Sequence, residues 1–444
     1  MTQAGGEAPI VNVGEAKRFR WRLLAVVGVA FVVRVVYVMK YSRSAPLGFD
    51  GNHYYELARR IADQFRYDDA LLNKSTVLFP PGYPAVLALG RVVGLGTRTK
   101  LLVYNAAIGS ATVALIGVLA RKYCSAGVAL TAAAIAAVYP NLFLADGALM
   151  TESVAGLFVV SALLLARRWR VERSWRVATA LGSILAWYSL TRTDGVLFSV
   201  LLVATLAIRA RQHGVARDAR RRRGGARALL VLIVPVLVIA AWQVRVQREM
   251  HAFVPIAING WAVMAGANCD ATYHGARIGA WEFPCVKVVE AAERGHVGEV
   301  VQNRYARDIG VKYVRAHVSD LPKVITARLA LTFGALHPFD ELATESEFEG
   351  RNETWSRFGF AMYVALVPCA LLGAVVLKRR GPPDLDLLIT PVIAVVVSTM
   401  IAYGNHRFRM PLEPVLVVGA AVGIHRALER WRVESVRPAS GGLV

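Results

Sequence analysis

The chain has 444 residues, of which 55% are hydrophobic and 19% are charged, and its formal net charge at pH 7 is +21. Soluble domains contain about 45–50% apolar residues, and here the apolar residues stand in long blocks, so the composition excludes a soluble domain and indicates an integral membrane protein. The basic residues cluster between these blocks, as in polytopic membrane proteins, which argues against nucleic acid as a partner.

The first apolar segment, about 23–40, follows a basic cluster and resembles a secretory signal. Its length and its end at Tyr37 and Lys40 favour an uncleaved spanning helix. We therefore expect an all-α polytopic membrane protein with about ten transmembrane helices, although several segments are shorter than the roughly 20 residues of a straight span. The nine further segments are about 101–120, 125–140, 152–166, 176–190, 195–209, 227–245, 358–377, 386–403 and 412–428.

Arginine-rich connections set the expected orientation. Five arginines lie in the connection 167–176 and eight in the connection 209–227. Both connections fall on the same side as the two termini, and the positive-inside rule makes that side cytoplasmic. We therefore expect a multi-pass protein of the cell membrane with both termini in the cytoplasm.

One transmembrane domain is expected to extend over residues 1–430, with a cytoplasmic tail at 431–444. Two long loops, 41–100 and 247–357, belong to the extracytoplasmic side of this domain. Within them, 54–66 has apolar residues at helical spacing opposite a charged face, which predicts an amphipathic helix on the outer leaflet. Three further segments are expected to be extracytoplasmic helices, and 322–336 is apolar enough to dip into the membrane. The four segments concerned are 54–66, 83–95, 298–317 and 322–336.

Asp50 follows the first span, in the tract Gly48–Tyr54. A charged carboxylate beside the bilayer is unfavourable in free energy, so its presence needs a structural or functional explanation. The structural explanation is a helix start, because aspartate often precedes an amphipathic helix. The functional explanation is a general base that deprotonates an acceptor hydroxyl while its oxygen attacks a sugar carbon, with His53 and Tyr54 positioning the substrate. The local pattern leaves both open.

Asp146 and Glu152 fall in the short outer turn between the third and fourth spans. One explanation is a capping box around Thr151 and Glu152. The other places one or both acids opposite Asp50, where they would position the acceptor or hold a divalent cation.

The tract His406–Pro411 is expected at the outer end of the last two spans. Its two arginines, Arg407 and Arg409, suit the capture of phosphate, because arginine keeps its charge and donates two hydrogen bonds to phosphate oxygens. His406 would complete this grip. Snorkelling to lipid headgroups is the alternative, but arginines on the outer side run against the positive-inside trend, which favours the phosphate site.

Other polar residues of the outer side have structural explanations. Arg192 lies close enough to Asp194 in the sequence to pair with it, and Arg34, within the first span, needs an acid partner or a phosphate. Cys269 and Cys285 share one outer loop, where a disulfide can form; two free thiols are the alternative. No cysteine or histidine pattern in the sequence indicates structural zinc.

The order of these features resembles the GT-C class of integral-membrane glycosyltransferases, and most of all the bacterial relatives of protein O-mannosyltransferases and of the lipid A aminoarabinose transferase. The more specific parts are the tract Phe79–Pro84, after the acid-bearing loop, and the tract Arg407–Pro411, before the last span. The resemblance covers about residues 15–430. Tyr83, within the first tract, is a further candidate for positioning the substrate.

The resemblance also implies a reaction. The donor would be a sugar linked to a polyprenyl phosphate, and an inverting transfer would move it to an envelope glycan, lipid or protein outside the membrane. Asp50 would match the first acid of the class, Glu152 or Asp146 the second, and Arg407 with Arg409 the grip on the donor phosphate. No cofactor is expected, while a divalent metal stays open.

Two alternatives remain at the level of the sequence. A transporter or lipid flippase would use intramembrane charges to line a path, but such proteins show paired halves and broken helices, and the sequence shows neither. A metal-dependent oligosaccharyltransferase or ligase would use a lipid-pyrophosphate donor, and the response to metal removal would distinguish it.

Overall fold

The computed structural model describes residues 13–69, 74–212, 219–286, 294–382 and 384–436. Within these ranges every regular element is a helix, apart from one isolated β-bridge between Asp68 and Ser75. The all-α fold class expected from the sequence is confirmed.

The ten apolar segments of the sequence all fall on helices. Helices suit such segments because a helix satisfies its own backbone hydrogen bonds, as a hydrocarbon environment requires. These helices are α1 (Val13–Tyr37), α4 (Arg98–Arg121), α5 (Ala126–Val138), α6 (Glu152–Glu172), α7 (Trp175–Thr191), α8 (Thr193–Gln212), α9 (Ala219–Met250), α16 (Glu353–Arg380), α17 (Leu385–Ile401) and α18 (Glu413–Val436).

Four stretches within the described ranges are helical, long and apolar enough to cross a membrane by themselves: 13–42, 98–121, 229–250 and 353–380. Helices α5 and α17 are apolar but have only 13 and 17 residues, fewer than a straight span needs. These findings support a multi-pass membrane protein, and the number of ten spans stays a prediction.

Shorter helices lie between the long ones, and four of them overlap the four extracytoplasmic helical segments expected from the sequence. Those four are α2 (Phe49–Gln64), α3 (Gly82–Val92), α13 (Glu299–Ala316) and α14 (Leu321–Thr332). The sequence did not predict α10 (Asn259–Gly266), α11 (Asp270–Tyr273), α15 (Pro338–Glu349), the π-helical turn η1 (Val38–Ser42) or the 3-10 turns η2 (Pro140–Leu142), η3 (Leu144–Gly147), η4 (Phe283–Cys285), η5 (Val318–Asp320) and η6 (His406–Arg409).

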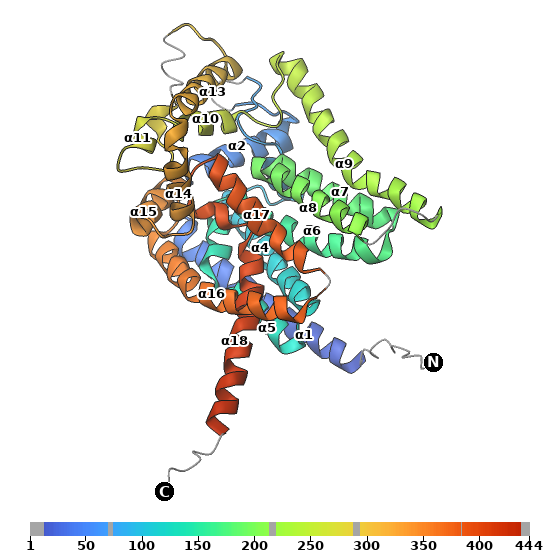
Figure 1. Cartoon of the computed structure of the whole chain (residues 1–444). Coiled ribbons are helices and arrows are strands. Elements are labelled where there is room, and N and C mark those ends of the chain that lie inside the picture. Colours follow the sequence, from blue (N-terminus) through green and yellow to red (C-terminus); the bar gives the residue numbers. More distant parts are fainter. Residues whose placement is uncertain (1–12, 70–73, 213–218, 287–293, 383, 437–444) are drawn as a thin grey trace.

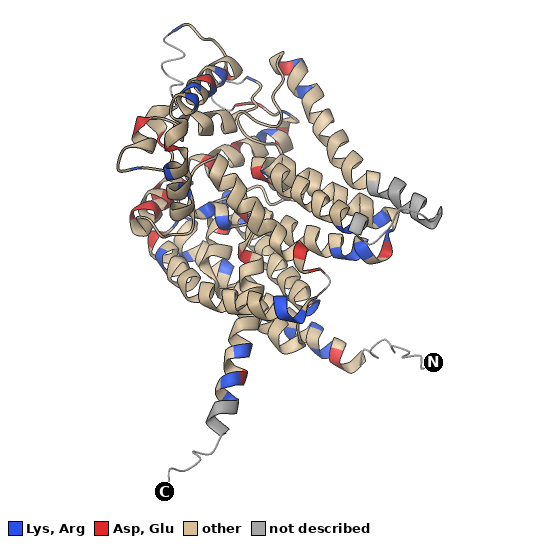
Figure 2. Cartoon of the chain, viewed as in Figure 1, with Lys and Arg blue, Asp and Glu red and all other residues tan. Residues whose placement is uncertain are grey.

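The long helices form the body of the molecule, and α10, α11, α13, α14 and α15 gather at its upper left in Figure 1. Helix α1 begins and α18 ends at the opposite, lower end. Figure 2 shows that the middle stretches of the long helices carry few charged side chains, whereas charges of both signs lie on the gathered helices. The molecule therefore has an apolar body and a polar cap.

Helix α4 lies at the centre of the apolar core, against α1, α5 and α6. Its residues Leu101, Val113 and Ile116 have no exposed surface, and the same holds for Ala132 and Ala133 on α5. Small side chains let membrane helices approach closely. This packing fixes the ends of α4 to α6 that face the polar cap.

Candidate active site

Asp50 lies in the first turn of α2, and its side chain is 20% exposed. The N-cap position belongs to Gly48, which has no side chain to cap the helix. The Oδ2 atom of Asp50 lies 3.3 Å from Nη1 of Arg407, a residue 357 positions away in the sequence. The fold therefore brings the first outer acid and the last outer arginine tract into direct contact.

Two glycines allow the chain before α2 to cross the end of α15 backbone to backbone. A Cβ atom at Gly48 would overlap the backbone of Glu349, and one at Gly350 would lie 2.6 Å from the backbone nitrogen of Gly48. Gly350 has a φ of 69°, a left-handed conformation that favours glycine. This crossing sets the start of α2, and with it Asp50, beside Glu349 and Arg351.

Glu349 joins two arginines at this crossing. Its Oε1 atom lies 3.1 Å from Nη1 of Arg407, and its Oε2 atom lies 2.7 Å from Nε of Arg351. The carboxylate is buried, with 5% of its side chain exposed. Burial raises the pKa of Glu349 to about 7, although both arginines act to lower it.

Glu152 begins α6 and is also buried. Its Oε1 atom accepts a hydrogen bond of 2.7 Å from Nη1 of Arg192, and its Oε2 atom lies 3.9 Å from Nη2 of Arg351. Arg192 pairs with Asp194 at 3.0 Å, as the sequence predicts, and donates to the hydroxyl of Thr151. Thr151 makes no capping hydrogen bond with the helix, so the structure contains no capping box here.

These contacts form one continuous charged network. In order, its members are Asp50, Arg407, Glu349, Arg351, Glu152, Arg192 and Asp194. Acids and arginines alternate along it, so every carboxylate has a cationic neighbour. Its members come from five separate parts of the chain, and only the folded protein brings them together.

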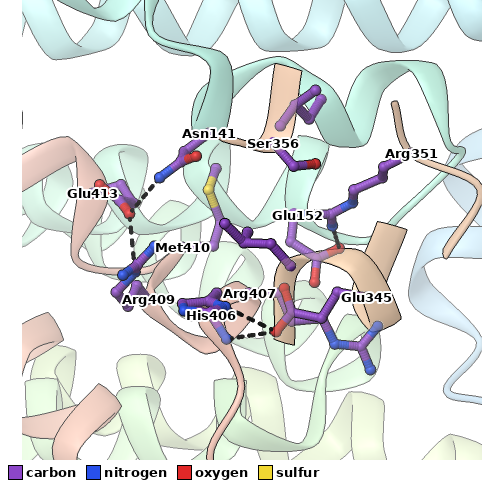
Figure 3. A pocket seen from close by; sticks show the side chains of 12 residues that line it. Asn141, Glu152, Glu345, Arg351, Ser356, His406, Arg407, Arg409, Met410 and Glu413 are labelled. Carbon is purple, nitrogen blue, oxygen red and sulfur yellow. Dashed lines mark hydrogen bonds and ion pairs between the residues drawn. The ribbon is translucent and has the colours of Figure 1, made fainter. Parts of the chain in front are cut away.

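A cleft opens beside the network (Figure 3). It contains about 500 Å³ of empty space, open solvent included. Arg351 and Glu152 lie at one end of the cleft, and Asn141, Arg409 and Glu413 at the other. The complete lining is Asn141, Leu144, Glu152, Leu342, Glu345, Arg351, Ser356, His406, Arg407, Arg409, Met410 and Glu413.

Several buried guanidinium nitrogens along this cleft make no hydrogen bond. They are Nη2 of Arg351, Nε of Arg407 and Nη1 of Arg409. The Nε atoms of Arg351 and Arg409 lie in ion pairs with Glu349 and Glu413. A buried donor without an acceptor is costly, and phosphate oxygens are strong acceptors for arginine. The arginines are therefore suited to holding an anion in the cleft.

His406 and Arg409 line the same cleft but have partners of their own. The Nδ1 atom of His406 lies 3.3 Å from Oε1 of Glu345, which also accepts a hydrogen bond from the His406 backbone. The guanidinium of Arg409 lies 3.8 Å from the ring centre of Tyr363, and its Nε atom is 3.6 Å from Glu413. Arg409 thus faces the end of the cleft away from Arg351.

Asp146 forms a separate buried pair. Its Oδ2 atom lies 3.1 Å from Nε of Arg34, and neither side chain is more than 1% exposed. Arg34 also donates to the backbone carbonyls of Ala137 and Leu142. Asp146 is not among the residues that line the cleft. Asp146 is therefore the acid partner of Arg34, one of the two explanations that the sequence offered for this arginine. The two acids of the outer turn are separated, because Glu152 lines the cleft and Asp146 does not.

The three positioning candidates, His53, Tyr54 and Tyr83, lie in one aromatic cluster with Phe79. Tyr54 makes edge contacts with Phe79 and Tyr83, and His53 lies 5.3 Å from the Phe79 ring. The hydroxyl of Tyr83 accepts a hydrogen bond of 2.6 Å from Asn105. Tyr54 and Tyr83 are buried. Of the three, His53 alone retains moderate exposure, and its Nδ1 atom is engaged by the Phe49 carbonyl.

Cys269 and Cys285 are joined by a disulfide with an S–S distance of 2.02 Å. The loop that they close contacts the segment just before η6, since Gly404 donates a backbone hydrogen bond of 2.8 Å to Gly279. In the part of the chain that the structure describes, no three histidine, cysteine, aspartate or glutamate side chains gather into a metal site.

Sequence reasoning missed Glu349, Arg351 and Glu345 as members of the site. All three lie in or beside the acidic stretch 340–353, which the sequence marks only by its charge. The signal available in advance was Gly350, because a glycine between two charged residues just after a helix marks a left-handed turn.

No family model and no curated protein matches this chain. Solved structures do match in fold. The archaeal oligosaccharyltransferase AglB from Archaeoglobus fulgidus, in complex with an inhibitory peptide and a dolichol-phosphate, superposes with a TM-score of 0.55 at 16% identity, over 96% of this chain and 53% of that chain. The same enzyme tethered to an acceptor peptide with the NVT sequon also gives a TM-score of 0.55 at 16% identity, over 94% and 51%.

ArnT from Cupriavidus metallidurans, bound to undecaprenyl phosphate, matches with a TM-score of 0.44 at 13% identity, over 94% of this chain and 81% of that chain. The chain spans about half the length of the oligosaccharyltransferase structures. At this identity the likeness shows the fold alone, and this chain shares that fold with an archaeal oligosaccharyltransferase. The resemblance stated from the sequence is confirmed at that level.

Proposed function

We propose that this chain is a membrane glycosyltransferase that moves a sugar from a polyprenyl-phosphate-linked donor to an acceptor on the extracytoplasmic side. The observation that carries the proposal is the contact of Asp50 with Arg407 at an arginine-lined cleft. A base and a phosphate grip must belong to one site, because the acceptor oxygen and the leaving phosphate both bond to the same sugar carbon in the transition state.

In this proposal the donor phosphate binds to Arg351 and Arg407. Both line the cleft, and both carry buried nitrogens without a hydrogen bond. During transfer the bond from the sugar carbon to the phosphate oxygen breaks, and the phosphate gains a negative charge. Fixed cationic donors aimed at a developing charge usually supply the largest single contribution to catalysis.

Asp50 acts as the general base. Its partial exposure lets an acceptor hydroxyl reach it. The acceptor proton moves to Asp50, the acceptor oxygen forms the new bond to the sugar carbon, and the phosphate leaves from the opposite face. This single displacement inverts the anomeric centre. A positioned base contributes roughly 10²–10⁴-fold to such a step.

The position of the site in the fold fits a reaction on the extracytoplasmic side of the membrane. The site lies among α2, α6, α15 and η6, near the polar cap, while α1 begins and α18 ends at the opposite end of the molecule. Ten spans with both termini in the cytoplasm would put the cleft at the extracytoplasmic face, where a polyprenyl carrier presents its sugar. The acceptor would be an envelope glycan, lipid or protein.

The fold match to an oligosaccharyltransferase favours one second candidate, an oligosaccharyltransferase or ligase. Its expected use of a lipid pyrophosphate and a divalent metal comes from the sequence analysis. The two candidates differ in their response to chelation. Transfer that survives EDTA supports the first candidate, and transfer that is lost with EDTA and restored by added Mn²⁺ or Mg²⁺ supports the second.

The test of the proposed function is an analysis of lipid-linked sugars in a deletion strain of the native host. We expect one polyprenyl-linked sugar to accumulate, and one envelope product to disappear, in the deletion strain and in a strain that carries Asp50→Asn. Wild-type protein and Glu353→Gln, an exposed glutamate paired with Arg357, should restore the product. Equal carrier levels in all four strains, at equal expression, would rule out the proposal.

A further inference from the structure

The charged network already contains more carboxylates than arginines. Four acids, Asp50, Glu349, Glu152 and Asp194, alternate with three arginines, Arg407, Arg351 and Arg192, which leaves one net negative charge when all seven are ionised. A phosphate that binds here adds at least one more negative charge. Buried charge without compensation is strongly unfavourable, so a bound phosphate competes with the buried carboxylates for their arginines.

Glu349 is the carboxylate most directly in competition with a phosphate. It contacts both cleft arginines, Arg351 at 2.7 Å and Arg407 at 3.1 Å. These are the two cations that the proposed function assigns to the donor. Asp50 contacts only one of them and is partly exposed, and Glu152 has Arg192 as its main partner. A phosphate would therefore take the two partners of Glu349 and leave the other acids paired.

The backbone holds Glu349 where it is. The crossing of Gly48 over the end of α15 presses against the Glu349 backbone. This close backbone approach positions the Glu349 carboxylate beside both arginines. The carboxyl group can change its charge there, because burial keeps its pKa near 7.

We propose that Glu349 is a proton-linked competitor at the phosphate site. In the empty site the ionised carboxylate occupies Arg351 and Arg407, and a proton from solvent neutralises it when a polyprenyl phosphate binds to these arginines. Release of the phosphate returns the proton to solvent and the carboxylate to the arginines. This inference rests on the proposed function, because it assumes that the arginine pair binds the lipid phosphate.

Other titratable and charged groups face Glu349 from every element packed around it, and the test must separate them. Asp50 lies on α2, Glu152 on α6 and Glu345 on α15 itself. Tyr403 and Arg407 come from the segment between α17 and α18, and Arg351 follows α15. His406 acts one step away, through its contact with Glu345.

The experiment is calorimetric binding of a polyprenyl monophosphate to the full-length protein in detergent, at pH 7 and pH 8 and in two buffers of different ionisation enthalpy. A free phosphate monoester has its second pKa near 6, so the probe changes little in this window. With a pKa of about 7, Glu349 is about half protonated at pH 7 and about one eleventh protonated at pH 8. Because phosphate binding requires the protonated form, wild-type affinity should fall about fivefold between these two pH values. At pH 8, close to one proton should be taken up for each phosphate that binds.

Glu349→Gln keeps the size of the side chain and an acceptor for Arg407 but has no charge. We expect it to bind the probe about tenfold more tightly than wild type at pH 8, without proton uptake. The control Glu353→Gln removes an exposed glutamate and should behave as wild type. Asp50→Asn should keep the pH dependence.

Three results would overturn the inference. Glu349→Gln with wild-type affinity and proton uptake would show that this residue does not titrate with binding. Loss of proton uptake in Asp50→Asn would transfer the role to Asp50. In both cases the proposed function would survive, because the probe still binds. A wild-type protein that does not bind the probe would instead remove the proposed function and, with it, the inference.

Discussion

Arg407→Ala is the substitution that tests the site most directly. The guanidinium of Arg407 is 20% exposed and contacts Glu349 at 3.1 Å and Asp50 at 3.3 Å. Removal of one partner from a buried charge pair costs about 3–5 kcal/mol. We expect the lower end of that range, about 3 kcal/mol, because Arg351 still contacts Glu349 at 2.7 Å. We also expect polyprenyl phosphate binding to be lost.

A lower stability alone could explain lost binding, so a second variant is needed. In Arg407→Ala with Glu349→Gln, the carboxylate left behind by the arginine is neutral, and most of the lost stability should return. Binding should not return, since the phosphate still lacks its cation. Thermal unfolding in detergent measures the first quantity, and calorimetric titration with the lipid phosphate measures the second. Restored binding in the double variant, or unchanged binding in Arg407→Ala, would refute a phosphate role for Arg407.

Asp50→Asn should reduce transfer roughly 10²–10⁴-fold. The lipid phosphate should bind to this variant as well as to wild type or better, because one competitor for Arg407 is gone. Wild-type turnover in this variant would contradict the assignment of Asp50 as the base. Arg409→Ala should lower the melting temperature, because the contacts of Arg409 with Glu413 and Tyr363 are lost. Its affinity for the lipid phosphate, measured by the same calorimetric titration, should stay within about twofold of wild type. A large loss of affinity would extend the phosphate site to Arg409. Arg34→Ala should destabilise the protein by about 3–5 kcal/mol, because the buried Asp146 loses its partner, and addition of Asp146→Asn should recover part of this in thermal unfolding. No recovery would show that the pair is not what stabilises the bundle.

The sequence predicted the helical fold well because its strongest signals are local. Each apolar segment is continuous, and each one falls on a helix in the structure. The segment 54–66 shows amphipathic spacing and corresponds to α2. Where no periodic pattern exists, as at η6 or α11, local residues gave no such prediction, and tertiary contacts determine the conformation.

No local pattern indicates the contact of Asp50 with Arg407. The resemblance stated from the sequence assigned the two residues to one reaction, and the structure brings them together. Glu349 and Arg351 were not anticipated, because an acidic stretch on an outer loop is usually a solvated surface. Their burial depends on the crossing of Gly48 over Gly350, which joins positions about 300 residues apart in the chain. Such an encounter leaves no trace in the spacing of nearby residues.

The two arginines of η6 show how local geometry divides a motif that looks uniform in the sequence. In an extended chain, residues two apart share a face, and Arg407 and Arg409 would act as a pair. In a 3-10 turn, successive side chains are about 120° apart, so residues two apart diverge. Arg407 accordingly meets Asp50 and Glu349, whereas Arg409 meets Tyr363 and Glu413. The second cation beside Arg407 is therefore Arg351, brought in from another part of the chain, and the grip proposed for the phosphate depends on the fold more than on the motif.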